Sequence, residues 1–449
     1  MFVGVCRLDV VQPTDDNCRR FLILRVRPAS RRYTAGTGTV DLIVRPFSRD
    51  HAQRGDRVLV TRIIGTCPGC KAGAAFGNVM VSGNVLVRGC LHCKYSEEFY
   101  LPPLFKVVLY LDQFFLSHAF RAELPEFVEA AKLIADLAHR QLLVCPYSTT
   151  HETETHQWRH PQQERLWEFI KRTSRGHEFH REYEIKRKQI VDGFERFLAG
   201  DTTPFPIETN DALPRELHDW ESYFWVDVPR PPQNVELTRE LKLKAVDELV
   251  GIFPDWRKDT TTFEEDRRLE SRVAAREYLK AYIKMAGRLA SGDVMATLDS
   301  PIDTRIVESL LHWDREDMDA PARWKRVVEY LNSDYFQEVP CEWVSSGLFA
   351  VLKDRVKQGH YQNLDKAKER FSGFFYDVEF VSAYAPYSDA MFLDNSMLDF
   401  ASDKNLGLTK RFGTRLFARS NWDDFMTYLE TVKARETKEI QTGLALVHP

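Results

Sequence analysis

The sequence predicts an α/β protein that carries an N-terminal all-β domain and a large helical insertion. Two observations predict the α/β part. The apolar run Lys106–Leu111 is followed by apolar residues at helical spacing and by a second apolar run, Leu142–Pro146, and a similar alternation returns from Phe374. A third observation, two pairs of cysteines between Cys67 and Cys93, predicts a small metal-binding hairpin. The length of 449 residues fits about three such units.

The N-terminal region, residues 1–105, is expected to be a small OB-like or SH3-like barrel with the hairpin attached. Short β-prone stretches alternate there with polar and Gly-rich turns. These stretches are Phe2–Val11, Phe21–Val26, Thr39–Val44 and Arg57–Ile64.

Positive charge is concentrated in the same region. Residues 1–105 hold 15 Lys or Arg and 8 Asp or Glu, although the whole chain has a net charge of −4. Because the planar guanidinium suits bidentate contact with phosphate, this surplus favours a domain that faces nucleic acid. Solvated strand faces explain it equally well. The candidate nucleic-acid-binding residues are Arg25, Arg27, Arg31, Arg32 and Arg57.

The cysteine pairs Cys67-Pro-Gly-Cys70 and Cys90-Leu-His-Cys93 have the spacing of two zinc knuckles. Two β-prone runs joined by a Ser-Gly-Asn turn lie between them, so residues 67–93 are expected to form a zinc ribbon with structural Zn²⁺. Two alternatives are a pair of disulfides, which a chain without an export signal disfavours, and an iron–sulfur cluster, which the hairpin does not support.

Composition excludes several classes of protein. Hydrophobic residues make up 43% and charged residues 29% of the chain, a mixture typical of globular proteins and not of disordered ones. The longest apolar runs are far shorter than the ~18–20 residues that cross a bilayer, and the N-terminus lacks the pattern of a secretion signal. We therefore expect a cytoplasmic protein without a membrane partner.

The α/β elements are expected in two blocks. In the first, strand 106–111 leads through a helix over 114–141 to a strand over 142–146, which makes one right-handed βαβ unit. In the second, the expected elements are a helix at Val378–Ala385 opened by Asp377, a strand at Ala390–Leu393, a helix at Ser396–Ala401, a strand at Thr414–Phe417 and a final helix capped by Asn421.

Residues 157–373, between the two blocks, are expected to be a mainly helical insertion. Apolar residues in the segment 181–198 recur at helical spacing, and Leu269, Val273 and Tyr282 mark a further helix. The Pro-rich stretch 200–236 is expected to be a long connection.

Two aspartates, Asp112 and Asp394, follow predicted strands, and ligands of open α/β sheets bind at the carboxyl ends of strands. Carboxylates gathered at one sheet edge repel one another unless they hold cations, and their hard oxygens select Mg²⁺ or Mn²⁺. Such ions can activate water for attack on a phosphodiester. The sequence therefore predicts a nuclease, with the candidate catalytic acids Asp112, Glu154, Asp377, Asp389 and Asp394.

Three segments resemble, in the right order, the signature blocks of PIN-like nucleases, especially the large PIN-like proteins found among bacterial and phage-defence genes. They are Tyr110–Gln113, Val144–Glu154 and Asp377–Asp394. The resemblance covers about 106–156 and 374–432. It implies a Rossmann-like three-layer α/β/α sandwich, built here from 106–156 and 374–449, and Mg²⁺- or Mn²⁺-dependent cleavage, usually of RNA.

The resemblance also implies a role for each residue that it matches. The implied ligands of the catalytic metal are Asp112, Glu154, Asp377 and Asp394. Asp389 is implied as a ligand or a supporting residue, Glu152 competes with Glu154, and His151 is implied to position its loop. The chain departs from a minimal PIN domain in the insertion of about 220 residues between Glu154 and Asp377.

We therefore expect a metal-dependent endonuclease, with RNA ahead of DNA as its substrate, in a bacterial defence or toxin system. Its N-terminal module is expected to recruit nucleic acid or a partner protein of that system. The alternative is a non-catalytic nucleic-acid-binding or scaffold subunit that uses the zinc ribbon.

Overall fold

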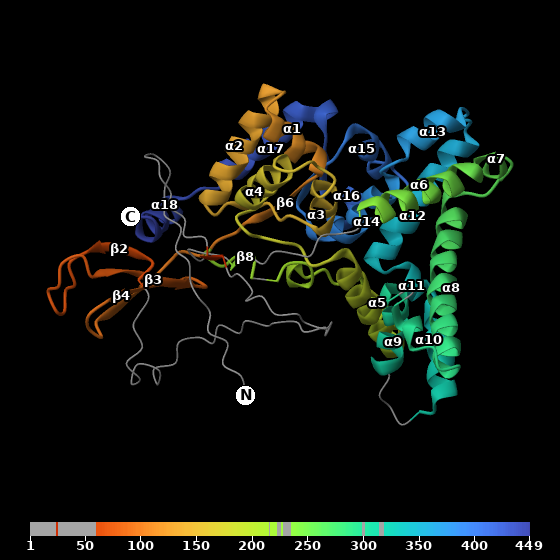
Figure 1. The fold of residues 1–449 in the computed structure, drawn as a ribbon, viewed down its shortest axis with the longest axis horizontal. Helices are drawn as coiled ribbons and strands as arrows, with labels where there is room; N and C mark the ends of the chain where they lie inside the picture. Colours follow the sequence, from red (N-terminus) through yellow and green to blue (C-terminus); the bar gives the residue numbers. More distant parts are fainter. Residues whose placement is uncertain are drawn as a thin grey trace.

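The computed structural model describes residues 24–25, 60–214, 216–221, 226–227, 235–298, 301–313 and 318–449. Figure 1 shows an antiparallel sheet near the C-terminus and an α/β part in the middle. On the far side lies a helical arm, the helices around α8 (Phe263–Ala290). The expected strands Phe2–Val11 and Thr39–Val44, and with them most of the expected barrel, lie outside the described residues. Strand β1 (Leu24–Arg25) pairs in parallel with β8 (Val226–Asp227).

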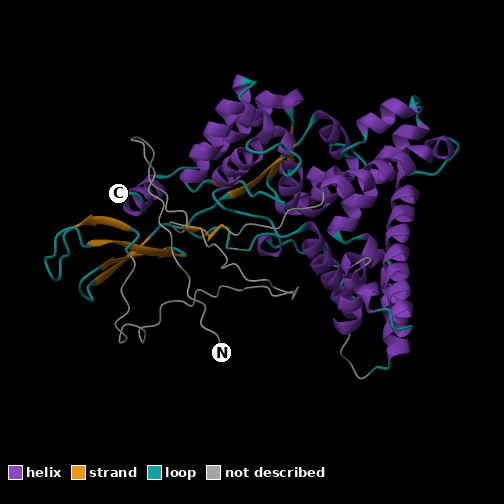
Figure 2. Ribbon diagram, in the orientation of Figure 1, coloured by secondary structure: helices purple, strands orange, loops and turns teal. Residues whose placement is uncertain are grey.

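A parallel sheet of four strands forms the centre of the α/β part, in the order β10-β9-β6-β7 (Figure 2). Its strands are β6 (Val107–Leu111), β7 (Leu143–Val144), β9 (Ala390–Phe392) and β10 (Arg415–Phe417). Every residue of β6, β7 and β9 is buried and apolar, as expected for strands that are covered on both faces. All four strands lie where the sequence predicts them, although β7 is shorter than the predicted 142–146.

Helices cover both faces of this sheet. Along β6, Val107, Leu109 and Leu111 belong to one apolar cluster, whereas Val108 and Tyr110 belong to another, which is the alternation of a pleated strand. The first cluster includes residues of α1 (Gln113–Arg121), α2 (Pro125–His139), α4 (Gln162–Ser174) and α17 (Trp422–Lys433). The second includes residues of α12 (Pro340–Lys357), α14 (Phe374–Tyr384) and α15 (Asn395–Ala401). The α/β part therefore has three layers.

Three predictions about helices in the α/β part are wrong. The single helix predicted over 114–141 is two helices, because Pro125 begins α2 at a position where its missing N–H costs no hydrogen bond. Asp377 does not open its helix but lies in the first turn of α14. Asn421 precedes α17, but that helix is not the last, since α18 (Lys438–Val447) follows it.

The segment between the two α/β blocks is mainly helical, as predicted. Helix α5 confirms the helix predicted over 181–198. No helix in the described ranges has both the length and the apolar character that crossing a bilayer requires. The remaining helical elements are α3 (Thr149–Thr155), α5 (Glu182–Ala199), η2 (Thr209–Asp211), α6 (Val235–Gly251), α7 (Phe253–Trp256), α8 (Phe263–Ala290), η3 (Val294–Leu298), α9 (Pro301–Trp313), α10 (Ala320–Leu331), α11 (Asp334–Gln337), α13 (Leu364–Arg370), η4 (Ala385–Tyr387), α16 (Leu408–Phe412) and η5 (Arg419–Asn421).

Helix α8 exists as predicted, but its predicted apolar stripe is wrong in part. Leu269 is 47% exposed, whereas Tyr282 packs against an apolar cluster, and the buried residues of α8 include the charged Asp266 and Arg267. Buried Asp266 of α8 forms an ion pair with Lys353 of α12 at 2.8 Å. A count of apolar residues at helical spacing therefore cannot detect an aspartate that is buried next to a lysine.

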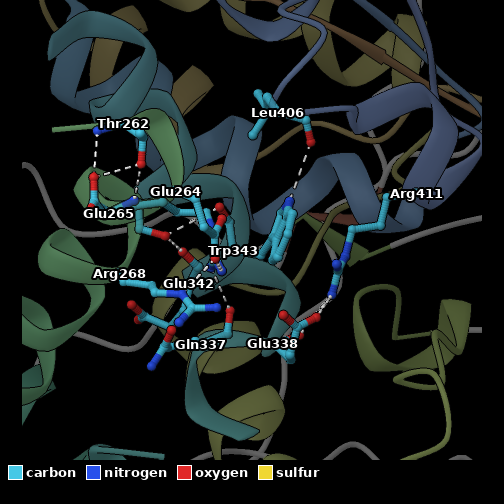
Figure 3. A network of polar contacts seen from close by, with 12 residues as sticks. Thr262, Glu264, Glu265, Arg268, Gln337, Glu338, Glu342, Trp343, Leu406 and Arg411 are labelled. Carbon is cyan, nitrogen blue, oxygen red and sulfur yellow. Dashed lines mark hydrogen bonds and ion pairs between the residues drawn. The ribbon is translucent and has the colours of Figure 1, made fainter. Parts of the chain in front are cut away.

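A polar network joins α8 to α12 and α16 (Figure 3). The Trp343 ring of α12 lies between two guanidinium groups, with Arg267 3.9 Å from the ring centre and Arg411 4.0 Å from it. Arg411 also pairs with Glu338 at 2.7 Å, and the Trp343 indole N–H donates to the carbonyl of Leu406 at 3.4 Å. These contacts tie the helical arm to the α/β part.

The second sheet is antiparallel and has the order β2-β3-β4-β5. Its strands are β2 (Arg62–Gly65), β3 (Phe76–Ser82), β4 (Val85–Cys90) and β5 (Ser96–Tyr100). Strands β3 and β4 form the hairpin that the sequence predicts. This sheet is joined to α18, because Asn78 and Arg88 donate to the carbonyls of Val447 and Leu446.

Candidate functional site

The parallel sheet reverses its winding direction between β6 and β9. From β6 the chain moves to β7 on one side, and it later returns to β9 on the other side. Ligands of open α/β sheets bind outside the carboxyl ends of the strands at such a point. Asp112 directly follows β6, and Asp394 follows β9 after one residue, so both lie at this point.

Asp112 is held between the two strands. Its N–H donates to the carbonyl of Phe392 in β9 at 2.9 Å, which extends the pairing of β6 and β9 beyond β6 itself. Asp112 is the residue before α1, yet its buried carboxylate does not make the usual capping bond to that helix. The sheet therefore fixes the backbone of Asp112, and the N–H of Gln113 is a backbone group that contacts its carboxylate.

Asp394 and Asp377 reach the same edge from the first turns of two helices. Oδ1 of Asp394 accepts the N–H of Met397 at 2.6 Å and thereby caps α15. Oδ2 of Asp377 lies so near Gly373 that a Cβ on this glycine would be 3.3 Å from it. Negative charge is favoured at helix N-termini, so both positions suit a carboxylate.

Glu154 is carried by α3, which His151 fixes against the end of β6. The His151 Nε2–H donates to the carbonyl of Leu111 at 2.7 Å, and Nδ1 accepts the N–H of Ser148 at 2.9 Å. Burial lowers the pKa of His151 to about 4, so the ring is neutral at pH 7. Because Leu111 precedes Asp112, this neutral ring sets the position of Glu154 relative to Asp112.

Lowering the pH is expected to destabilise the protein through His151. A base with a lowered pKa in the folded state contributes stability above its unfolded pKa of about 6.5, and this stability is lost as the pH falls toward about 4. Between pH 7 and 5, we expect the free energy of unfolding to fall by about 2 kcal/mol more in the wild type than in His151→Gln, measured by urea unfolding. His448, whose pKa burial also lowers to about 4, is the control, since His448→Gln should leave the His151 contribution in place. Identical pH dependence in the wild type and His151→Gln would refute the neutral buried ring.

Four of the five candidate acids line one open cleft of about 1100 Å³. Asp112, Glu154, Asp377 and Asp394 reach it from the end of β6, from α3, from α14 and from the start of α15. Glu152, the competitor of Glu154, is buried and is not among the residues that line the cleft.

Gln113 adds a polar group to the wall of this cleft. Its Nε2 donates to the hydroxyl of Thr155 at 3.1 Å, which links α1 to α3. Its Oε1 is buried and has no hydrogen-bond partner among the described residues. A buried acceptor without a donor calls for a water molecule, an ion or a ligand next to it.

The carboxylates in the cleft repel one another. Burial raises the pKa of Asp112 well above its ordinary value, and the charges of Glu154, Asp377 and Asp394 raise it further. A cation in the cleft would remove this repulsion and favour the ionised form of Asp112.

Asp389, the fifth candidate acid, lies at the other end of the strands. Its Oδ2 accepts the N–H of Val108 at 2.7 Å, and its carbonyl accepts the N–H of Arg415 at 2.9 Å. It precedes β9 whereas Asp394 follows it, and five extended residues span about 16 Å. Asp389 therefore joins β9 to its two neighbours and is not brought together with the other four acids.

One of the five predicted nucleic-acid-binding arginines lies within the described residues. Arg27, Arg31, Arg32 and Arg57 lie outside the described residues, and Arg25 is described only as part of β1.

The four predicted zinc ligands come together. Among the described residues, Cys67, Cys70, Cys90 and Cys93 form the one group of three or more candidate metal-binding side chains whose ligand atoms all lie within 4.8 Å. The Sγ atoms of Cys67 and Cys93 are 3.7 Å apart, and those of Cys70 and Cys90 are 3.6 Å apart. Four sulfurs bound to one tetrahedral Zn²⁺ at about 2.3 Å lie about 3.8 Å from each other, whereas a disulfide is about 2.05 Å long. The distances fit a zinc site and exclude disulfides.

The local structure favours ionisation of one of these thiols, that of Cys90, whereas the pKa of Cys70 is raised. Burial opposes ionisation of Cys90, but the N–H of His92, which donates to its sulfur at 3.3 Å, helps to lower the pKa of Cys90 to about 6. At the first knuckle, a Cβ on Gly69 would lie 3.0 Å from the Tyr95 side chain, so the turn needs glycine there.

Comparisons of the chain with protein-family models, with curated proteins and with solved structures gave no match. Function is therefore inferred from the geometry and chemistry of the site.

Sequence reasoning missed several residues that line the cleft. They are Gln113, Arg121 and Arg370. Gln113 could have been found from its place beside Asp112. Arg121 and Arg370 carry no such signal, because only the folding of α1 and α13 around the sheet brings them to the cleft. Arg159 and Arg165, which also line the cleft, belong to the stretch 159–188, whose nine Lys or Arg and five acids fit either a nucleic-acid channel or a solvated helix face.

Proposed function

We propose that this protein is a metal-dependent nuclease that hydrolyses phosphodiester bonds. The observation that carries the proposal is the gathering of Asp112, Glu154, Asp377 and Asp394 around one cleft at the switch point of a parallel sheet. The raised pKa of Asp112 supports it, because carboxylates that repel one another in a cleft are suited to cations.

The donor set fits Mg²⁺ or Mn²⁺. Carboxylate and amide oxygens are hard ligands, and the cleft offers both kinds, including the unpartnered Oε1 of Gln113. Mg²⁺ keeps several of its water ligands in protein sites. The carboxylates that bind it therefore need not lie as close to one another as the four thiols do. When bound, such an ion polarises the phosphate and lowers the pKa of a water molecule that attacks in line.

The chain itself would contribute fixed positions. Asp112 and Asp394 are set by the sheet and by a helix cap, so they would hold a cation with little rearrangement. Neutral His151 keeps α3, and with it Glu154, against the end of β6. Oε1 of Gln113 would accept a hydrogen bond from a water molecule or a substrate hydroxyl.

The proposal extends to the nuclease family, the substrate, the zinc site and the N-terminal arginines. We propose a PIN-like nuclease with RNA as its substrate, supported by a three-layer α/β part with acids after two adjacent strands. The cysteine cluster would hold structural Zn²⁺, and the N-terminal arginines would recruit RNA or a partner protein of a defence system.

A cleavage assay tests the proposal. End-labelled single-stranded RNA, tRNA, single-stranded DNA and duplex DNA are incubated with the protein in Mn²⁺ or Mg²⁺. We expect cutting by the wild type and by Asp423→Asn, which changes an exposed acid away from the cleft, but not by Asp112→Asn plus Asp394→Asn. Equal cutting by all variants would reveal a contaminant and refute the site. Tight binding without cutting in any metal would favour the scaffold subunit.

A further inference from the structure

The cleft that holds the four acids also holds exposed arginines. Arg121, Arg159 and Arg165 line it, and none of the three has an ion-pair partner among the described residues. Elsewhere in the protein neighbouring charges do pair, as Arg140 and Asp136 do at 2.7 Å. The cleft therefore has an acidic part, with the four acids, and a basic part, in which the three arginines outnumber a further acid, Glu123.

Trp158 brings the basic part together. The Arg121 guanidinium lies 4.6 Å from the centre of the Trp158 ring, and Phe120 contacts the same ring edge-on at 6.0 Å. Arg159 follows Trp158 in the chain, and Arg165 lies in the first turn and a half of α4. The stack holds the end of α1 against the segment that leads into α4, so that all three guanidinium groups border the same cleft.

The basic part lies at a distance from the acidic part. Asp112 precedes the first residue of α1 and Arg121 is its last residue, so the helix separates them by about 13 Å along its axis. A nucleic-acid strand advances about 3.4 Å per nucleotide when it is stacked, so this separation corresponds to about four nucleotides.

We infer that Arg121, Arg159 and Arg165, gathered around Trp158, form a clamp for the backbone phosphates of a single-stranded nucleic acid, several nucleotides away from the phosphate at the acids. The position of the reacting phosphate rests on the proposed function. An acidic peptide would meet repulsion from the four carboxylates, whereas a polynucleotide phosphate at the acids is joined to them by divalent cations. A cleft of about 1100 Å³ accommodates a few nucleotides of one strand but does not enclose a duplex.

Binding measurements test this clamp independently of cleavage. The assay follows the fluorescence anisotropy of labelled 12-nucleotide single-stranded RNA and DNA in Mg²⁺, with the full chain carrying Asp112→Asn and Asp394→Asn to prevent cutting. Adding Arg121→Gln, Arg159→Gln and Arg165→Gln is expected to weaken binding at least tenfold at 100 mM salt. Each lost phosphate contact lowers the slope of log Kd against log salt by about 0.7 for a single strand, so the three changes should lower it by about 2.

Matched variants keep the test specific. Arg172→Gln changes an exposed arginine of α4, the helix that also carries Arg165. Arg172 does not line the cleft, so this change should leave the slope unchanged. Replacing the three arginines by lysine should keep most of the slope, because the charges remain.

Three results would overturn the clamp: an unchanged slope in the glutamine variant, an equal loss in Arg172→Gln, or equally tight and clamp-dependent binding of a duplex. The clamp and the nuclease can fail separately. A clamp-dependent slope together with a wild type that never cuts would support the clamp and refute the proposed function. Cutting by the wild type without any effect of the arginines on binding would do the reverse.

Discussion

Replacing Asp112 with asparagine is expected to abolish cleavage and to stabilise the metal-free protein. Burial and three neighbouring carboxylates raise the pKa of Asp112, so ionised Asp112 opposes folding at neutral pH. A carboxyl whose pKa is raised on folding binds more protons in the folded state, so the contribution of Asp112 to stability should rise as the pH falls from 7 toward the ordinary range of aspartate, opposite in sign to the contribution of His151. Asp112→Asn removes the charge at every pH and should lack this gain.

The loss of activity should be large. Metal-assisted polarisation of a phosphate is worth several kcal/mol in the transition state, and each 1.36 kcal/mol is a factor of ten, so a decrease of at least about 100-fold is expected.

Thermal unfolding with and without Mn²⁺ measures the stability side of this prediction. Mn²⁺ should raise the unfolding temperature of the wild type and of the surface control Asp423→Asn, but it should leave that of Asp112→Asn nearly unchanged, because a ligand that binds only the folded state stabilises it. If metal-free Asp112→Asn is instead less stable than the wild type at pH 7, Asp112 has a structural role and its assignment as a ligand fails.

Loss of zinc is expected to unfold the end of the antiparallel sheet that carries the cysteines. The core at this end is small, since its buried members are only Cys67, Ala75, Phe76 and Cys90 among the described residues, whereas Val81 and Leu86 at the other end belong to the large apolar cluster of the α/β part. A core of four residues does not hold the cysteine end by itself, and structural zinc sites supply folding free energy directly, on the order of 10 kcal/mol in isolated zinc-finger peptides. The wild type should contain about one zinc per chain, and Cys67→Ser should contain almost none.

Hydrogen exchange locates the consequence. Amides at the cysteine end of the sheet, near Phe76 in β3 and Cys90 in β4, should lose protection in Cys67→Ser, while those of β6 and β9 in the parallel sheet keep theirs. Cys341→Ala, which changes a buried cysteine outside the cluster, is the control and should keep its zinc. Zinc bound at the wild-type level in Cys67→Ser would show that the metal is held elsewhere.

The sequence was sufficient for those features that depend on local pattern. Continuous apolar runs located β6 and β9, because a strand that is buried on both faces is apolar throughout and does not alternate with polar residues. The spacing of the four cysteines sufficed for the knuckles, since each pair needs only its own turn. Within the acids, only Asp112 and Asp394 could be placed from pattern alone, because each follows a recognisable strand.

Features that depend on tertiary packing could not be read in this way. Asp389 and Asp394 are five residues apart and both next to β9, yet they lie at opposite ends of that strand. Asp266 of α8 is buried next to Lys353, with which it forms an ion pair, and no periodicity within α8 contains this information. The arginines of the cleft likewise acquire their position from α1 and α4, and not from their own neighbours in the sequence.

The pairing of β6 with β9 joins residues 281 positions apart, as in the bond between Val108 and Asp389. During synthesis, a chain that has reached β7 and the helical arm still lacks β9 and, with it, Asp377 and Asp394. The cleft therefore cannot close around a cation until almost the whole polypeptide has left the ribosome. An enzyme that attacks RNA would in this way be inert while it is still attached to the message and the ribosome that produce it.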